Sequence, residues 1–367
     1  MKINPRKMLY CILALFPSIL MLDGFLSRVS DIAVAFIFMS LLMELTKRSA
    51  LNYKILLICV LIISTFCLVL HRVGTEGIRD YLKLITFCWL ALHVSQKNII
   101  DEIKVYIEEH SILIKTQIYS LVVINIYLLF LPSSYDVMYG LVLLKGNMYH
   151  THTYAYYVSS FILLVMISNV TNTEKIALIS FCIFLVLRTG VRSVLLFIAI
   201  VIIAQYGRNL KRTRVAFVVC ILLFLTYPFL RSTEIFSKTS EALKYGSATS
   251  GRDIIWKADL QCFVNSTLLE KVIGHGYEFP YRYHESVLSM AIWSHNDFLH
   301  LLLVGGLVLT LIYIVSLYVY FYKCRIGFLY ILAVIILIMS NGVFVYSEML
   351  PIIAYLPITS PERRFTL

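Results

Sequence analysis

Arginine and histidine residues suited to anion binding and proton transfer gather in the second half of the chain. Arg188 and Arg192 lie four residues apart, Arg252 follows in a polar segment, and His295 precedes a long apolar run. Two guanidinium groups can hold a phosphate through paired hydrogen bonds. A histidine with an ordinary pKa of ~6.5 can accept a proton near neutral pH. These residue types favour a reaction in which a phosphate leaves and a hydroxyl is deprotonated.

The spacing of Arg188 and Arg192 has two interpretations. Residues four apart share one helix face, but Gly190 between them equally fits a tight turn on the outer side of the membrane. An arginine at such a boundary can clamp a phosphate or simply reach toward lipid headgroups. Both alternatives stay open at this point.

A polar segment at 231–294 interrupts the apolar sequence. Within it, the apolar spacing of residues 254–260 predicts a short amphipathic helix on the membrane, capped by Ser250 or Thr249. With Arg252 in its first turn, the helix N-terminus would form a cradle for a pyrophosphate. An ordinary surface helix with a solvated arginine explains the same pattern equally well.

Aromatic residues follow the turn signal Gly274-His275-Gly276. Tyr277 and Arg282 belong to this tyrosine-rich stretch, in which rings beside polar groups suit stacking against sugars. Tyrosine is also common at membrane interfaces, so the pattern has a second, purely structural explanation. We take Tyr277 and Arg282 as candidate substrate-binding residues.

The start of the following apolar run contains the candidate base. We expect Ser294 to cap this helix, His295 to lie in its first turn, and Asn296 and His300 to share one face. Asn296 is therefore another candidate substrate-binding residue. The pair Gly305-Gly306 allows close packing of helices further along the run.

The composition indicates that membrane helices position these residues. Of 367 residues, 60% are hydrophobic and 14% are charged, and the mean hydropathy is +0.83. A soluble domain of this kind would expose a large apolar surface. The sequence predicts an all-α polytopic membrane protein with about 11–12 transmembrane helices and one large periplasmic loop containing short helices. The predicted spans are 8–22, 32–45, 55–70, 81–94, 112–131, 153–168, 176–187, 193–206, 215–230, 297–321, 326–345 and 346–358.

Basic residues orient these predicted helices. The cluster at 207–214 gives the strongest contrast between short connections, and the positive-inside rule places it in the cytoplasm. The polar segment then faces the periplasm. We accordingly divide the chain into transmembrane helices at 1–230, a periplasmic loop at 231–294 and C-terminal transmembrane helices at 295–367.

Other functional classes find less support. The sequence has no HExxH or CxxC motif and no glycine-rich nucleotide loop, so we expect no metal, no cofactor and no nucleic-acid partner. Charges are rare within the spans, which disfavours a transporter for lipid-linked sugars, the alternative of a different class. Charges gather instead at helix ends, where we expect Asp80 to pair with Arg79 or Lys83.

The order of these motifs resembles the O-antigen ligase and polymerase superfamily, and most closely the Wzy-type O-antigen polymerases. The similarity rests on the run 188–193 at an outer helix end and on Ser250-Gly251-Arg252 in a large outer loop. It continues through Gly274-His275-Gly276 and the run 295–299, with Gly305 downstream. The second half of the chain carries most of these motifs.

This resemblance implies a metal-independent glycosyltransferase of the bacterial inner membrane with its active site on the periplasmic side. The implied partners are an undecaprenyl-pyrophosphate-linked oligosaccharide, membrane lipid and, as a candidate protein partner, a chain-length regulator. Arg192, Arg252 and His295 match the family's essential arginines and histidine by position, and Arg188 is an adjacent binding residue.

The acceptor distinguishes two activities within the superfamily. A polymerase transfers the glycan to the next lipid-linked repeat unit, whereas a ligase transfers it to lipid A-core. The compact chain and the tyrosine-rich loop favour the polymerase, with the ligase as the alternative. His295 is the expected base, and Glu278, Glu285 and Asp297 are alternative bases or orienting groups.

Overall fold

The structure is a computed structural model that describes most of the chain. It covers residues 4–45, 75–138, 141–207 and 251–359, except 24, 27 and 97, and from the remaining parts Ile58 and Ile62. Four predicted features lie wholly or almost wholly outside these ranges, namely the spans at 55–70 and 215–230, the basic cluster at 207–214 and the first part of the polar segment, 231–250.

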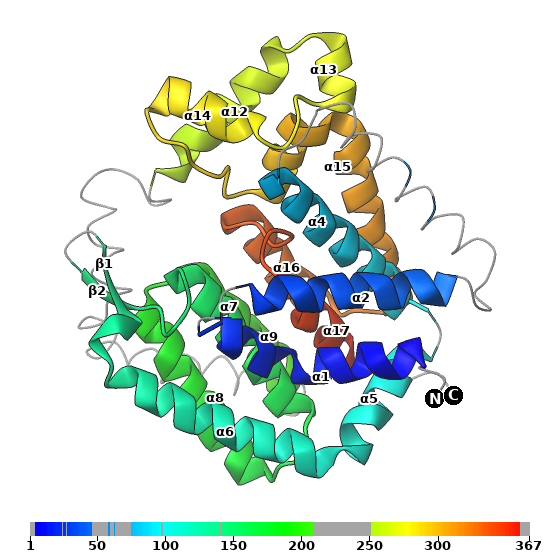
Figure 1. Cartoon of the computed structure of the whole chain (residues 1–367), viewed down its shortest axis with the longest axis vertical. Helices are drawn as coiled ribbons and strands as arrows, with labels where there is room; N and C mark the ends of the chain where they lie inside the picture. The colour runs from blue at the N-terminus through cyan, green and yellow to red at the C-terminus, as the bar shows by residue number, and fades with distance from the viewer. Residues whose placement is uncertain are drawn as a thin grey trace.

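The described residues are mostly helical, as predicted. They form 14 α-helices, whose bounds are α1 Pro5–Asp23, α2 Val29–Leu45, α4 Thr75–Val94, α5 Ile99–Glu109, α6 Ser111–Leu129, α7 Thr151–Ile167, α8 Asn172–Thr189, α9 Arg192–Tyr206, α12 Arg252–Asn265, α13 Leu268–Ile273, α14 Phe279–Leu288, α15 Asp297–Lys323, α16 Phe328–Ser340 and α17 Met349–Thr359 (Figure 1). Many coincide with predicted spans, and α5 was not predicted.

A short hairpin also departs from the predicted all-α class. After the 3-10 turn Pro132–Ser134, strands β1 (Tyr135–Met138) and β2 (Leu141–Leu144) pair antiparallel, with Tyr135 opposite Leu144. The strands have four residues each, too few for an alternating pattern to stand out beside long apolar helices.

Three described helices, α1, α6 and α15, are long and apolar enough to cross a membrane. The helices α7, α9, α16 and α17 are also apolar but shorter. These lengths and compositions support a membrane protein. The number of spans and their orientation stay predictions.

Helix ends follow recognisable local signals. At the start of α8, the Thr171 hydroxyl accepts a hydrogen bond from the Glu174 amide, and the Glu174 carboxylate accepts one from the Thr171 amide. Gly190 ends α8 in a left-handed conformation with φ 69°, and α9 begins at Arg192. Arg188 and Arg192 therefore belong to two helices joined by a tight turn, one of the two alternatives that the sequence allowed.

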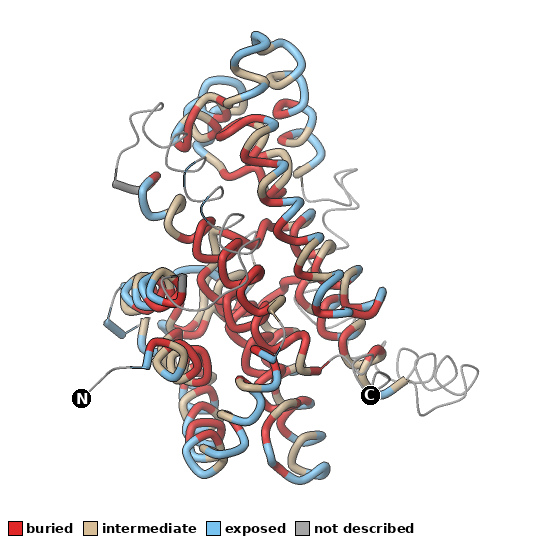
Figure 2. The backbone as a smooth tube through the Cα atoms, turned by 90° about the vertical axis from the view of Figure 1, so that its right-hand side faces the viewer, coloured by how far each residue is buried: buried red, intermediate tan, exposed pale blue. Residues whose placement is uncertain are grey.

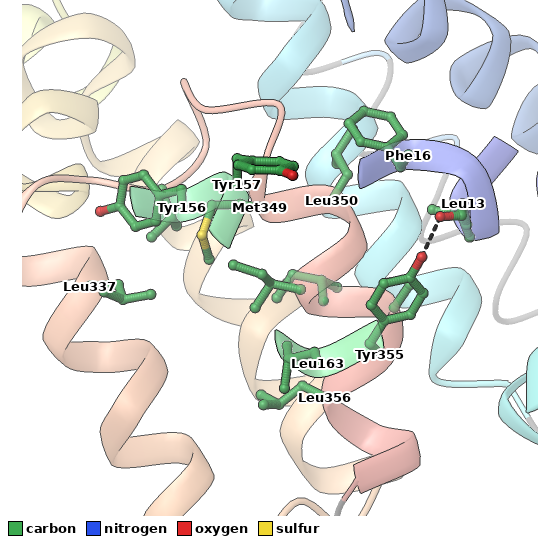
Figure 3. Packing of buried hydrophobic residues seen from close by; sticks show 14 of the residues in the cluster. Leu13, Phe16, Tyr156, Tyr157, Leu163, Leu337, Met349, Leu350, Tyr355 and Leu356 are labelled. Carbon is green, nitrogen blue, oxygen red and sulfur yellow. Dashed lines mark hydrogen bonds between the residues drawn. The ribbon is translucent and has the colours of Figure 1, made fainter. Parts of the chain in front are cut away.

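The core is centred on α7 and α17. Nearly every residue of both helices is buried, and α17 packs against α1, α4, α5 and α7. Figure 2 shows this buried region along the centre of the molecule. Figure 3 shows Met349, Leu350 and Leu356 of α17 among side chains of α1, α7 and α16. The Tyr355 hydroxyl of α17 donates a hydrogen bond to the Leu13 carbonyl of α1.

Helices α12, α13 and α14 form a lobe beyond the central helices (Figure 1). All three pack against α15. α12 begins at Arg252, so it includes the predicted helix at 254–260 and extends beyond it. Its N-cap position is Gly251, with φ 81°, rather than Ser250 or Thr249 as predicted. The lobe and the start of α15 together carry most of the predicted site residues.

Candidate functional site

Arg252 is joined to the start of α9 through a buried asparagine. Its Nη2 atom donates a hydrogen bond of 2.6 Å to Oδ1 of Asn341, in the turn between α16 and α17. Nδ2 of Asn341 donates in turn to the Ser193 hydroxyl at 2.8 Å. Ser193 directly follows Arg192. Two helix starts that carry predicted site arginines, those of α9 and α12, therefore meet at Asn341.

Asp297 fixes the turn that contains Asn341. Its two carboxylate oxygens accept hydrogen bonds from the Val343 amide at 2.9 and 3.0 Å, and Oδ2 accepts one from the Tyr313 hydroxyl at 2.5 Å. A Cβ atom on Gly342, which has φ 76°, would lie 2.5 Å from Asp297 Oδ1. The carboxylate is fully buried in these contacts. This arrangement favours an anchoring role for Asp297 over its alternative role as a base.

Asn296 rather than Ser294 caps α15, so this prediction is wrong by two residues. Asn296 Oδ1 accepts hydrogen bonds from the amides of Phe298 and Leu299 at 3.0 and 3.3 Å, and the helix begins at Asp297. His295 precedes the helix and has φ 53°, a left-handed conformation that side chains with a Cβ rarely adopt. Such strained positions are enriched at functional sites.

His295 is electrostatically coupled to Arg252. Burial and, after it, the positive charges of Arg252 and His284 together lower the pKa of His295 to about 4. The ring is thus neutral at pH 7 and able to accept a proton. Its Nδ1 atom is buried and accepts no hydrogen bond from any residue that the structure describes. The structure brings the predicted base and the predicted α12 arginine within electrostatic range of each other.

Two tryptophans hold the segment that directly precedes His295. The Trp256 indole of α12 donates a hydrogen bond of 3.0 Å to the Ser294 carbonyl. Trp293 stacks on His300 of α15, with ring centroids 3.4 Å apart. The backbone that presents His295 is therefore attached to both α12 and α15.

The turn Gly274-His275-Gly276 docks into a break in α15. The amides of His275 and Gly276 donate to the carbonyls of Leu303 and Val304 at 2.7 and 2.8 Å. Gly306 interrupts the helical conformation there, with φ 62°. Because the break interrupts the helix's own hydrogen bonding, its carbonyls can accept hydrogen bonds from the turn.

Both glycine motifs are required by this close approach. A Cβ atom on Gly274 would overlap the Val304 carbonyl, and one on Gly306 would lie 2.5 Å from the Val272 carbonyl. The sequence suggested a turn and a site of close helix packing as separate features. In the structure they are the two halves of one junction, which attaches the lobe to α15.

The remaining predicted binding residues are more dispersed. Tyr277 is only 3% exposed, and its ring packs edge-on against Tyr81 at 6.4 Å, which leaves little surface for stacking a sugar. Arg282 is exposed on α14. Arg188 lies over the ring of Tyr135 in the hairpin at 5.9 Å.

A second charged cluster lies at the start of α4. Asp31 of α2 forms an ion pair with Arg79 at 2.9 Å and another with Lys83 at 3.5 Å. Lys83 also donates to the Val345 carbonyl at 3.2 Å. Asp31 therefore meets both cations, and the expected pairing of Asp80 with Arg79 or Lys83 stays a prediction. The Asn341–Glu348 turn contacts this cluster as well as the Arg252 site.

Sequence reasoning missed Ser193 and Asn341. The dipeptide Asn341-Gly342 after an apolar run was a readable helix-end signal, but nothing in it indicated an arginine partner.

In the described part of the chain, no three His, Cys, Asp or Glu residues are grouped so that they could hold a metal ion. Comparison with protein-family models and with curated protein sequences finds no match to this chain.

Proposed function

We propose that this protein is an O-antigen polymerase, a membrane glycosyltransferase that elongates a surface polysaccharide on its lipid carrier. The donor is a glycan on undecaprenyl pyrophosphate, and the acceptor is the next lipid-linked repeat unit. The observation that carries the proposal is the meeting of the α9 and α12 starts at Asn341, with His295 in electrostatic range of Arg252. The motif order in the sequence supports the same family.

The proposed chemistry uses this arrangement directly. The bond between the anomeric carbon and the pyrophosphate oxygen breaks, and the carrier pyrophosphate leaves with an additional negative charge. Arg252 and Arg192 stabilise that charge through their guanidinium groups. The acceptor hydroxyl forms the new glycosidic bond and gives its proton to neutral His295.

Partly buried surroundings favour the anion clamp and keep the base neutral. A low-dielectric site strengthens the attraction between a guanidinium group and a phosphate. The hydrogen bond from Arg252 to Asn341 fixes the direction of the guanidinium plane before substrate arrives. A pKa of about 4 keeps His295 neutral across physiological pH, although it also makes the ring a weaker base.

Purified protein supplied with a lipid-linked repeat unit tests the proposal. Formation of long lipid-linked chains supports a polymerase. Transfer that requires added lipid A-core supports the ligase instead, and passage of the lipid across vesicles without any product supports the transporter. The matched variant His295→Ala should still bind the donor lipid but form no chains, because the pyrophosphate contacts come from arginines.

A further inference from the structure

A buried pair, Asp259 of α12 and His284 of α14, lies behind the segment that leads to His295. The Nε2 atom of His284 is 2.6 Å from Asp259 Oδ1, and its Nδ1 atom is 2.6 Å from the Ile292 carbonyl oxygen. The two side chains are 1% and 0% exposed, respectively. His284 therefore connects α12 and α14 to the backbone three residues before His295.

The hydrogen-bond partners of the His284 ring require one proton at each of its two nitrogens. A carbonyl oxygen can only accept, so Nδ1 must carry a proton. A carboxylate oxygen also accepts, so a second proton must lie between Nε2 and Oδ1. Oδ2 of Asp259 is buried and accepts no hydrogen bond from any described residue. The charge of His284 is thus the main compensation available to that carboxylate.

We propose that Asp259 and His284 form a permanently protonated pair that positions His295. This inference rests on the proposed role of His295 in the transfer reaction. The pair holds the Ile292 carbonyl, while Trp256 holds the Ser294 carbonyl at 3.0 Å. The backbone before His295 is therefore fastened at two points to the helix that begins with Arg252, which keeps the base and the arginine in register.

The electrostatics around the ring agree with a charged His284. Burial opposes its charge, but the hydrogen bonds to Asp259 and Ile292 and the charge of Asp259 outweigh burial and raise the pKa of His284. The titratable groups facing the pair are Cys262 and Tyr283, which sense Asp259, and His295 and His300, which sense His284. The positive charge of His284 helps to keep His295 neutral.

Two substitutions separate the charge from the mechanical link. In Asp259→Asn, the amide can donate to Nε2 while Nδ1 still donates to Ile292, so the link persists around a neutral ring. In His284→Gln, one side chain cannot reach both partners, so the link itself is lost. His110, a partly exposed residue at the junction of α5 and α6, provides the control variant His110→Gln.

The direct test is nitrogen NMR of histidine-labelled full-length protein in lipid nanodiscs, recorded without substrate. We expect both ring nitrogens of His284 to carry protons in the wild type at pH 7.5. In Asp259→Asn, the His284 ring should be neutral, and the pKa of His295 should rise above about 4 but stay below ~6.5, because burial and Arg252, the larger causes, remain. A singly protonated His284 in the wild type at that pH, or an unmoved His295 in Asp259→Asn, would overturn the proposal.

Elongation assays with the lipid-linked repeat unit test the positioning role. His284→Gln should lower kcat by about 10²-fold at every pH, with KM little changed, because His295 is misplaced. Asp259→Asn should keep most of its activity at pH 8. On acidification, its activity should fall at a higher pH than that of the wild type. Equal activity of His284→Gln and His110→Gln would refute the role of the pair in positioning His295. If His284→Gln does not fold, the pH profile of Asp259→Asn activity decides. The NMR result stands even if no elongation is found, so failure of the pair and failure of the polymerase proposal are distinguishable.

Discussion

At the residue scale, the role of Arg252 depends on the shape of its guanidinium group as well as on its charge. We expect Arg252→Lys to lower activity by about 10²-fold or more, because an ammonium group cannot hold Asn341 and a phosphate in one plane. The measurement is the rate of chain elongation by purified protein. Lys257→Ala, an exposed change one turn along α12, should leave the rate unchanged. Wild-type rates in Arg252→Lys would contradict the proposed clamp.

The protonation of His295 should also set the pH dependence of chain elongation. The pKa of this ring is lowered to about 4, so the neutral form that accepts a proton persists far below ~6.5. We expect elongation to fall on acidification only as the pH approaches about 4. Folding follows the same sign: the unfolded ring binds a proton below ~6.5 and the folded ring does not, so stability decreases as the pH falls from there toward 4. Activity lost already near pH 6.5 would argue against His295 as the group that must be neutral.

Residue types alone revealed which side chains could act, but not what holds them. Arg192, Arg252 and His295 were identifiable because a phosphate-transfer site needs cations and a base. Asn341 and Ser193 carry no such chemistry in isolation, and 148 residues separate them. Their role depends on a contact that only the folded chain creates. Burial of Tyr277 was likewise invisible, because a tyrosine in a polar segment reads as exposed.

At the element scale, the junction of the Gly274 turn with α15 should be sensitive to a single methyl group. Gly274→Ala places a Cβ atom against the Val304 carbonyl and strains a residue with φ 77°. We expect a loss of about 1–3 kcal/mol in unfolding free energy. Gly251→Ala is the matched control, because Gly251 also has positive φ, at 81°, but no atom within 4 Å of the added Cβ.

Unfolding of both variants in detergent, followed by circular dichroism, separates crowding from backbone strain. The control should lose only the smaller cost of a left-handed alanine, about 1 kcal/mol. Equal losses in the two variants would mean that the junction is not close-packed as described.

Helix existence was predictable at this scale, and helix ends were less so. The apolar run at 297–321 became α15, Asp297–Lys323, because continuous apolar sequence of that length has few alternatives. Its cap was misassigned because Ser294 and Asn296 are both good capping residues. The left-handed backbone at His295 decides between them, and sequence does not encode that angle openly. The break at Gly306 was hidden for the same reason.

At the scale of the whole molecule, the contacts that assemble the site cross the chain. Lys83 of α4 meets the turn after α16, and Asn341 in that turn meets α9 and α12. One turn therefore touches both charged clusters. Composition and long apolar runs could predict a helical membrane protein, because a spanning helix satisfies its own backbone hydrogen bonds within the bilayer. It could not predict which helix ends would meet, since that follows from the packing of the entire helix set.

The orientation of the chain in the membrane gives the last prediction. The basic cluster at 207–214 should face the cytoplasm and the segment 231–294 the periplasm, because cytoplasmic connections retain lysine and arginine. A reporter enzyme that works only after export, fused at Ser247, should be active, and the same reporter fused at Lys211 should be silent. A reporter that works only in the cytoplasm should give the reverse pair of results. Cytoplasmic activity at Ser247 would place the α12–α14 lobe inside the cell, away from a periplasmic lipid-linked glycan, and the polymerase proposal would fail with it.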